Sequence, residues 1–183
     1  MIWAIELGNT RNKRTRFSPH GEQLGETEFF KLDDWSWLDS MTEGVELRIV
    51  NTAQRFVPED LSTAVLTQDS PWPMTWQAAP TIGLDRCLAV LGARRLHPVG
   101  NLAVISCGTC LTGTLLDAAN TLRGGPISPG WTMRLEAMAA GARVLPRLSP
   151  ESVPFSPTGT ITTESSMQQG AYHGMLAEMQ FWI

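Results

Sequence analysis

A short apolar run followed by a glycine-containing polar turn occurs twice in this chain, about one hundred residues apart. Ile2–Ile5 precedes Glu6-Leu7-Gly8-Asn9-Thr10, and Leu102–Ile105 precedes Ser106-Cys107-Gly108-Thr109-Cys110. A second strand-like stretch follows each turn and ends at breaker residues, so both segments are predicted to form β-hairpins. The repetition indicates two domains built on one plan, although two such short windows also match by chance.

The rest of the chain alternates between strand and helix patterns, which predicts a mixed α/β fold. We expect a strand at 45–50, a helix after Pro58, and further helices at 84–96, at 132–144 and from Thr163 onward. The last helix should have Thr162 or Thr163 as its N-cap and Glu164 in its first turn. His97-Pro98-Val99-Gly100 separates the two halves, which places a domain boundary between residues 97 and 98.

The charge balance narrows the classes of function. With 14 Lys and Arg against 18 Asp and Glu, the 183-residue chain has a formal net charge of -4. This mild acidity argues against a nucleic-acid-binding protein, which needs clustered basic residues. The apolar runs are far shorter than the ~20 residues that span a bilayer, and Met1–Ile5 lacks the basic start of a signal peptide. Three Cys without a secretion signal favour reduced thiols, so we expect a cytoplasmic protein that does not bind membranes.

The first turn has the residue types of a phosphate-binding loop. Gly8 lets the backbone approach a ligand, Asn9 and Thr10 offer polar side chains, and Lys13 adds a positive charge. The carboxylate of Glu6 could hold Mg²⁺ through water, because hard cations prefer oxygen ligands. The alternative is a plain hairpin turn that needs no ligand, and the local evidence alone favours that alternative.

Gly83-Leu84-Asp85-Arg86 opens the helix expected at 84–96. Adjacent residues on a helix point in different directions, so Asp85 and Arg86 are not a natural intrahelical ion pair. An Asp here can accept a proton from a substrate hydroxyl, and the neighbouring Arg can hold an anionic group. An N-capping Asp beside a solvated Arg explains the same residues equally well.

Two further motifs are compatible with either chemistry or simple structure. Cys107-x-x-Cys110 has the spacing of redox and zinc motifs, but a strand is predicted after it and too few other zinc ligands remain. Two buried thiols on a strand are therefore the favoured interpretation. Gly124-Gly125-x-x-Ser128-Pro129-Gly130 is either a tight loop or a backbone segment that closes against a nucleotide or a partner subunit.

Taken together and in order, these segments resemble the type III pantothenate kinases, members of the actin-like, sugar kinase and Hsp70 ATPase superfamily. The resemblance covers nearly the whole chain. The matching segments are Glu6-Leu7-Gly8-Asn9-Thr10-x-x-Lys13, Gly83-Leu84-Asp85-Arg86, Cys107-Gly108-Thr109 with Thr112, Gly124-Gly125-x-Ile127-Ser128-Pro129-Gly130-x-x-Met133-Arg134, Leu145-Pro146, Thr163-Glu164-x-Ser166-x-Gln168-x-Gly170 and Gly174-x-x-x-Glu178.

The resemblance implies an α/β protein made of two RNase H-like domains, residues 1–97 and 98–183, with ATP bound in the cleft between them. It implies transfer of the ATP γ-phosphate to pantothenate, which gives 4'-phosphopantothenate on the route to coenzyme A. Mg²⁺, a monovalent cation (K⁺ or NH₄⁺) and a homodimer with pantothenate near its interface belong to the same expectation.

Carried over residue by residue, the resemblance gives each motif a role. The residues expected along ATP are Glu6, Leu7, Gly8, Asn9, Thr10, Lys13 and Thr109. The residues expected around pantothenate are Gly83, Leu84, Asp85, Arg86 and Thr163. Among them, Asp85 would be the catalytic proton acceptor and Arg86 an anchor. Ser106 stands at the position linked to the monovalent cation, and Glu6 at the position that would hold Mg²⁺ through water.

Several features depart from the family pattern. The family has Asp at the positions of Glu6, Ser106 and Thr114. Its members also continue well beyond the position of Ile183, so we expect an incomplete second domain whose apolar end, Phe181-Trp182-Ile183, is covered by a partner or by a missing segment. These departures motivate a second hypothesis, a non-catalytic paralogue that binds nucleotide or a protein partner. A thiol redox module is a third.

Overall fold

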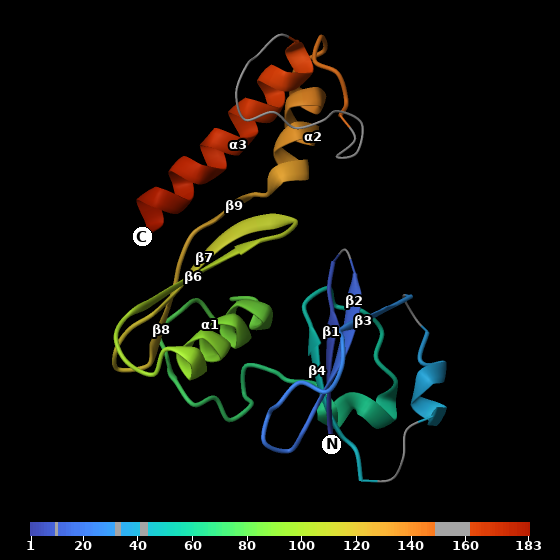
Figure 1. Cartoon of the computed structure of the whole chain (residues 1–183). Coiled ribbons are helices and arrows are strands. Elements are labelled where there is room, and N and C mark those ends of the chain that lie inside the picture. Colours follow the sequence, from blue (N-terminus) through green and yellow to red (C-terminus); the bar gives the residue numbers. More distant parts are fainter. Residues whose placement is uncertain (10, 32–33, 41–43, 149–161) are drawn as a thin grey trace. The chain divides into compact units, whose positions relative to one another are not determined.

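The computed structural model describes residues 1–9, 11–31, 34–40, 44–148 and 162–183. The chain divides into two compact units, whose helices and strands are labelled in Figure 1. The first unit comprises Met1–Pro73 and Pro80–Leu88, and the second comprises Met74–Ala79 and Ala89–Ile183. The mixed α/β class is confirmed. The division into RNase H-like domains at residues 97 and 98 stays a prediction.

The first unit is built on a four-stranded sheet. Its strands are β1 (Ile2–Leu7), β2 (Asn12–Phe17), β3 (Glu28–Phe30) and β4 (Glu46–Asn51), in the order β3-β2-β1-β4. β1 and β2 form the first predicted hairpin, whereas β4 lies parallel to β1 and confirms the strand expected at 45–50. The helix expected after Pro58 is a short 3₁₀ helix, η2 (Glu59–Ala64), and a second one, η1 (Ser36–Ser40), precedes β4 in the sequence.

One face of this sheet carries the hydrophobic core of the first unit. Three of its side chains are at most 2% exposed: Ile5, Leu7 and Ile49. The guanidinium of Arg14 extends this face, because it lies 4.8 Å from the centroid of the Trp37 ring that packs on the core. Successive residues of a strand point to opposite faces, so Glu6 points away from the core.

The second unit contains a five-stranded sheet. Its strands are β5 (Thr75–Trp76), β6 (Leu102–Cys107), β7 (Cys110–Leu116), β8 (Thr121–Gly124) and β9 (Ile127–Pro129). The strand order is β5-β8-β7-β6, and β9 pairs with β7. β6 and β7 form the second predicted hairpin. The sequence repeat therefore corresponds to two antiparallel hairpins, one in each unit.

The α-helices of the described chain are α1 (Leu84–Leu96), α2 (Trp131–Gly141) and α3 (Thr163–Trp182). α1 has the predicted bounds, and α2 ends before the predicted Val144. α3 begins as expected after Thr162, whose side chain accepts a hydrogen bond from the Ser165 N–H at 3.2 Å in a capping box. A local cap thus sets the start of this helix.

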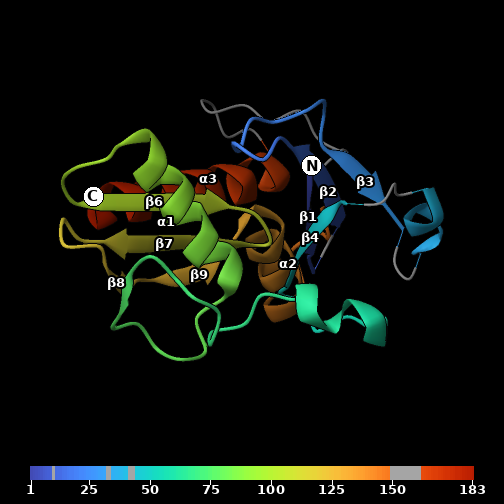
Figure 2. The same ribbon diagram turned by 90° about the horizontal axis from the view of Figure 1, so that it is seen from below.

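The second half of α1 and the C-terminal end of α3 lie against opposite faces of the second sheet (Figures 1 and 2). On the α1 side, Arg94 donates hydrogen bonds to the carbonyl oxygens of Gly100 and Asp117, both at 2.8 Å. On the α3 side, a Cβ at Gly113 of β7 would lie 3.1 Å from the Trp182 ring. Glycine at this position lets the helix approach the strand.

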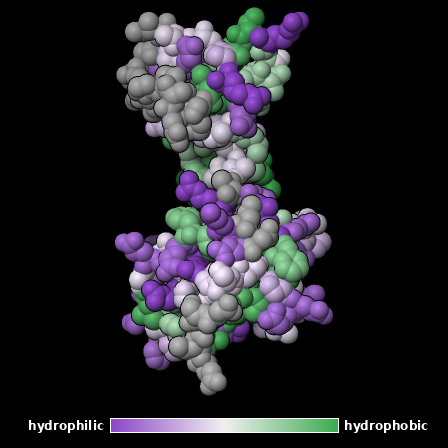
Figure 3. Space-filling model, turned by 90° about the vertical axis from the view of Figure 1, so that its right-hand side faces the viewer, coloured by the Kyte–Doolittle hydropathy of each residue, from purple (hydrophilic) through white to green (hydrophobic). Residues whose placement is uncertain are grey.

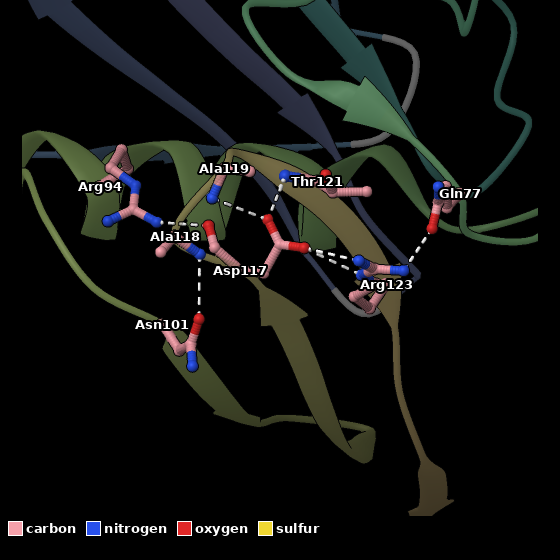
Figure 4. Close-up of polar contacts among 8 residues, drawn as sticks. All are labelled: Gln77, Arg94, Asn101, Asp117, Ala118, Ala119, Thr121 and Arg123. Atoms are coloured by element: carbon pink, nitrogen blue, oxygen red, sulfur yellow. Dashed lines mark hydrogen bonds and ion pairs between the residues drawn. The ribbon is translucent and has the colours of Figure 1, made fainter.

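A hydrogen-bonded turn joins β7 to β8 (Figure 4). The carboxylate of Asp117 accepts bonds from the N–H groups of Thr121 (2.8 Å) and Ala119 (3.0 Å) and from Nη2 of Arg123 (2.7 Å). These bonds, the one from Thr121 above all, hold the pKa of Asp117 below its usual value. Arg123 also donates to Gln77, which ties the residue after β5 to β8.

Hydrophobic and hydrophilic side chains are interspersed on the face of the molecule that Figure 3 shows. Among the helices of the described residues, none has both the length and the apolar character needed to cross a bilayer.

Candidate functional site

The first hairpin turn, with Gly8 and Asn9, lies in the first unit. A Cβ at Gly8 would come within 2.7 Å of the Arg11 carbonyl oxygen, so the turn requires glycine there. Glu6 and Lys13 are paired across β1 and β2, with Nζ 3.0 Å from Oε2. Their side chains are 39% and 41% exposed, which leaves this ion pair accessible to a ligand. Leu7 is buried in the core, and the predicted ligand Thr10 lies outside the described residues.

The loop after β4 packs onto this turn. The N–H groups of Thr52 and Ala53 donate to the carbonyl oxygen of Leu7, at 3.1 and 3.2 Å. Arg55 donates through Nη2 to the carbonyl oxygen of Asn9, at 3.1 Å. Sequence reasoning missed Arg55. Predicting the parallel pairing of β1 with β4 would have pointed to the loop that contains Arg55. Parallel strands end at the same edge of an open α/β sheet, and ligands bind at that edge.

Gly83-Leu84-Asp85-Arg86 lies at the N-terminus of α1, also in the first unit. The carbonyl oxygen of Gly83 accepts the first helical bonds, from the N–H groups of Arg86 (3.1 Å) and Cys87 (3.4 Å). Asp85 is exposed in the first helical turn, whereas Arg86 is only 7% exposed and burial lowers the pKa of its guanidinium. The interpretation of an N-capping Asp beside a solvated Arg is therefore wrong: Gly83 precedes the helix and Arg86 is buried.

Thr109 lies in the second hairpin turn, in the second unit, and is exposed. Its carbonyl oxygen accepts a hydrogen bond from the Gly130 N–H at 3.1 Å. A Cβ at Gly130 would lie only 2.3 Å from the Gly108 carbonyl oxygen. The glycine-rich segment that ends at Gly130 therefore closes against the second hairpin turn of its own chain.

Three polar residues share one face of the second hairpin. Ser106 is paired with Thr112 across β6 and β7, and Thr114 follows two residues later on β7. Cross-strand partners and residues two apart point to the same face. Ser106 is exposed, whereas Thr114 is 2% exposed. The two positions where the sequence lacks an expected Asp thus differ in their access to solvent.

A polar network joins β9, α2 and α3. Nη2 of Arg134 lies 2.6 Å from Oε1 of Glu178 and 3.0 Å from the hydroxyl of Ser128, which donates to the other carboxylate oxygen of Glu178. These bonds, first that of Ser128 and then that of Arg134, lower the pKa of Glu178. Thr163 is the exposed first residue of α3 and lies after the N-cap.

The three cysteines are free thiols. Cys107 is paired with Leu111 across the second hairpin, and Cys110 is the residue before Leu111. The side chains of Cys107 and Cys110 therefore point to opposite faces, which disfavours a disulfide between them. Cys107 Sγ lies 4.0 Å from Sδ of Met179 on α3. The thiol of Cys107 is exposed, unlike the buried thiols expected from the sequence.

The predicted site residues fall in both units. Those in the first unit are Glu6, Leu7, Gly8, Asn9, Lys13, Gly83, Leu84, Asp85 and Arg86. Those in the second unit are Ser106, Thr109 and Thr163. The structure brings Glu6 and Lys13 into contact, and their assembly with the other residues into one site stays a prediction.

Comparison with known proteins decides the family. The family model of the type III pantothenate kinases matches residues 43–182, which is more than half of the chain. The chain belongs to the type III pantothenate kinase family.

Curated type III pantothenate kinases are similar to this chain over different lengths. The one from Sphingopyxis alaskensis is 30% identical and aligns with 98% of this chain and 78% of its own length. The one from Flavobacterium psychrophilum is 29% identical over 100% of this chain and 80% of its own length. The one from Phocaeicola vulgatus is 35% identical over 64% of this chain and covers 49% of its own length. The matches thus span from about half to about four fifths of these relatives.

A solved structure shares the fold of this type III pantothenate kinase family member. It is a conserved Campylobacter jejuni protein assigned to the Baf family of transcriptional activators, with a TM-score of 0.59 and 16% identity. The match covers 99% of this chain and 79% of that one. At this identity the likeness concerns the fold alone.

The sequence resemblance predicts Mg²⁺ and a monovalent cation, and the residues predicted to hold them, Glu6 and Ser106, include only one acidic side chain. Within the described ranges, no three His, Cys, Asp or Glu side chains are grouped so that they could hold a metal ion. Glu6 is one accessible carboxylate beside Lys13, which fits an Mg²⁺ ion held mainly by substrate phosphates and water. Ser106, which was predicted to stand at the monovalent-cation position, and its cross-strand partner Thr112 offer only neutral hydroxyl oxygens.

Proposed function

We propose that this protein is a type III pantothenate kinase that transfers the γ-phosphate of ATP to pantothenate, giving 4'-phosphopantothenate and ADP. The observation that carries the proposal is an exposed carboxylate, Asp85, beside a buried guanidinium, Arg86, at the start of α1. Membership of the family and the likeness of the whole chain to proteins of that name support it.

Asp85 is the proposed proton acceptor. As the pantothenate hydroxyl oxygen bonds to the γ-phosphorus, the bond from that phosphorus to the ADP oxygen breaks and Asp85 takes the hydroxyl proton. Its exposed position leaves the carboxylate within reach of a substrate. Gly83, two residues earlier, lies close to this carboxylate, and a Cβ at Gly83 would require the Asp85 side chain to move.

Arg86 is the proposed anchor for the pantothenate carboxylate, with Leu84 and Thr163 completing the substrate-binding set. A guanidinium can bind a carboxylate through two parallel hydrogen bonds. Because Arg86 is 7% exposed, water screens its charge less than it would on an open surface. Anchoring the acid end of pantothenate would hold the hydroxyl at the other end in place for transfer.

Gly8, Asn9 and Lys13 are proposed to lie along the ATP phosphates, with Thr109 of the second unit joining them. The Lys13 ammonium would balance phosphate charge, and its ion pair with Glu6 holds it at the turn. Mg²⁺ bound with ATP neutralises charge on the transferred phosphate, and Glu6 would hold that ion through water.

Ser106 and Thr112 would offer hydroxyl oxygens to K⁺ or NH₄⁺ at the position where the family has an acid. The transfer described above uses no group from this position. The proposed setting is a cytoplasmic homodimer that acts on pantothenate and ATP, and the net charge of -4 agrees with a protein that does not bind nucleic acid.

The test is a mixture of purified full chain, ATP, Mg²⁺, K⁺ and pantothenate, followed by mass spectrometry for 4'-phosphopantothenate. We expect product from the unaltered chain and a loss of at least 100-fold in kcat for Asp85→Asn, as is usual for a lost general base. Asp69→Asn is the matched control, because Asp69 is also an exposed carboxylate of the first unit. Absence of product from the unaltered chain would refute the proposal.

A non-catalytic paralogue that binds nucleotide or a protein partner is the second candidate. The specific observation in its favour is that the second hairpin has hydroxyl residues, Ser106 and Thr114, where the family has acids. This candidate predicts ATP binding without product. It also predicts that the double variant Glu6→Asp, Ser106→Asp creates or sharply raises activity, and an unchanged rate in that variant would count against loss of these acids as the cause.

A further inference from the structure

We propose that Arg55 is a further phosphate-binding residue, whose guanidinium, placed at the Gly8–Asn9 turn, contacts the triphosphate of ATP. The inference rests on the proposed function, because that function puts the ATP phosphates at this turn. Neither the sequence motifs nor the family resemblance singled out this residue.

Arg55 reaches the turn from the loop after β4. Its Nη2 donates to the carbonyl oxygen of Asn9 at 3.1 Å, a contact between residues 46 apart in the chain. Its Nε is buried and has no hydrogen-bond partner within the described residues. A buried donor left unpaired destabilises the folded protein, so its presence needs an explanation. An anion bound at this turn would provide that explanation, because its negative charge would attract the whole guanidinium group of Arg55.

The charge balance at the turn also favours an anion. The ammonium of Lys13 is paired with Glu6, and the guanidinium of Arg11 lies over the Phe29 ring at 5.4 Å from its centroid. In the part of the chain that the structure describes, Arg55 forms no ion pair. A planar guanidinium binds phosphate through two parallel hydrogen bonds, which suits Arg55 to a triphosphate better than a point charge.

Asn51, the last residue of β4, holds the backbone of Arg55 in position. Its Oδ1 accepts a hydrogen bond from the Arg55 N–H at 2.8 Å, and its Nδ2 donates to the Arg55 carbonyl oxygen at 2.7 Å. Between them, Gln54 has φ 52°, in the left-handed region that few non-glycine residues adopt. One amide side chain thus closes a tight turn that directs Arg55 toward Asn9. Asn51 is therefore a positioning residue.

A purely structural role is the competing explanation, in which Arg55 only ties two loops together. The two roles differ in what they predict. A structural tie predicts a lower Tm without a selective effect on phosphate, whereas a phosphate ligand predicts weaker binding of any triphosphate. It also predicts partial rescue by lysine, which keeps the charge and loses the planar fork.

The experiment is calorimetric titration of the full chain with Mg-ATP and, separately, with inorganic tripolyphosphate. We expect Arg55→Gln to weaken both affinities at least 10-fold, Arg55→Lys to fall between it and the unaltered chain, and Asn51→Ala to weaken both at least 3-fold. The matched control is Arg48→Gln, which removes an exposed arginine of β4 that pairs with Glu46. This control should stay within twofold of the unaltered chain.

Tm of the ligand-free variants identifies any that fail to fold, and Arg55→Lys then carries the test. Tripolyphosphate affinity within twofold of the unaltered chain in Arg55→Gln would overturn the inference, and so would an unaltered chain that binds neither probe. Binding of both probes with the expected losses, but without phosphorylation of pantothenate, would refute the proposed function and leave Arg55 as a phosphate ligand.

Discussion

Gly130 packs against the carbonyl oxygen of Gly108 so closely that a Cβ on Gly130 would lie 2.3 Å from that atom. The second neighbour of this Cβ would be the carbonyl oxygen of Thr109, at 2.5 Å. Both are backbone atoms, which cannot move aside as the end of a flexible side chain can. The start of α2 and the second hairpin turn are thus fitted to each other through a position that only glycine can occupy.

Gly130→Ala should therefore destabilise the protein by about 2 kcal/mol, because overpacking against fixed atoms forces the backbone to shift. The expected fall in Tm is roughly 4–8 °C for a chain of this length. Differential scanning calorimetry measures it. Gly170→Ala is the matched control: Gly170 lies within α3, a Cβ there meets nothing within 4 Å, and alanine should add about 0.5–1 kcal/mol. Equal Tm values for both variants would contradict the close contact.

The carboxylate of Glu178 should make stability depend on pH. Its hydrogen bonds from Ser128 and Arg134 lower its pKa in the folded protein below the usual 4.5. The stabilisation is therefore fully present above pH 4.5 and is lost as the pH falls through the lower folded pKa. Because the group is partly exposed, we expect about 1 kcal/mol at pH 7.

Urea unfolding of the unaltered chain and of Glu178→Gln, compared between pH 7 and pH 3, measures this effect. The difference in the free energy of unfolding should be largest at pH 7 and should shrink below pH 4.5. Glu136→Gln, on an exposed position of α2, is the control and should change stability by less than about 0.5 kcal/mol at either pH. A difference that grows toward low pH would have the wrong sign for this explanation.

Structural features that depend on residues close in the sequence could be predicted, and features that depend on contacts between distant residues could not. Thr162 caps α3 through a residue three positions away, and the bounds of α1 follow from an apolar spacing inside the helix, so both were predictable. The contact of Gly130 with Gly108 and that of Arg55 with Asn9 depend on which strands pair, and no short window contains that information. These distant contacts shape the candidate site.

The burial of Arg86 at the start of α1 also could not be predicted from the sequence. Asp85 and Arg86 are neighbours, and sequence alone allowed a solvated Arg beside an N-capping Asp. The structure exposes Asp85 and buries Arg86, because consecutive helical residues face different surroundings. Which of two polar neighbours turns inward depends on the packing of the helix, so the pattern of residue types could not decide it.

The three thiols should react at very different rates. Burial raises the pKa of Cys87 to about 11, and its side chain is inaccessible, so it should stay unmodified by Ellman's reagent at pH 8. Cys107 is exposed and should react first, with the half-buried Cys110 slower. Unfolding in guanidinium should release all three. Cys107→Ser should abolish the fast phase alone; a fast phase that persists would show that the hairpin is arranged differently.

Counting free thiols with Ellman's reagent after mild oxidation tests the redox hypothesis. Because Cys107 and Cys110 point to opposite faces of the hairpin, the thiol count should not fall by two after treatment with oxidised glutathione at low concentration. A disulfide between them, detected by mass spectrometry of a digest, would overturn this geometry and revive the redox hypothesis.

Aspartate was expected at two positions of the second hairpin, Ser106 and Thr114, and introducing it should lower the free energy of unfolding by different amounts at the two positions. Ser106 is exposed, so Ser106→Asp should change the free energy of unfolding by less than about 0.5 kcal/mol. Thr114 is 2% exposed on the same face, and an aspartate there must either lose its hydration or take up a proton, at a cost of about 2–4 kcal/mol. Urea unfolding at pH 7 measures both variants. Similar stabilities would mean that position 114 is open to water or has a compensating cation. The expected contrast means that the fold tolerates an aspartate at position 106 by itself, whereas an aspartate at position 114 requires further substitutions around it.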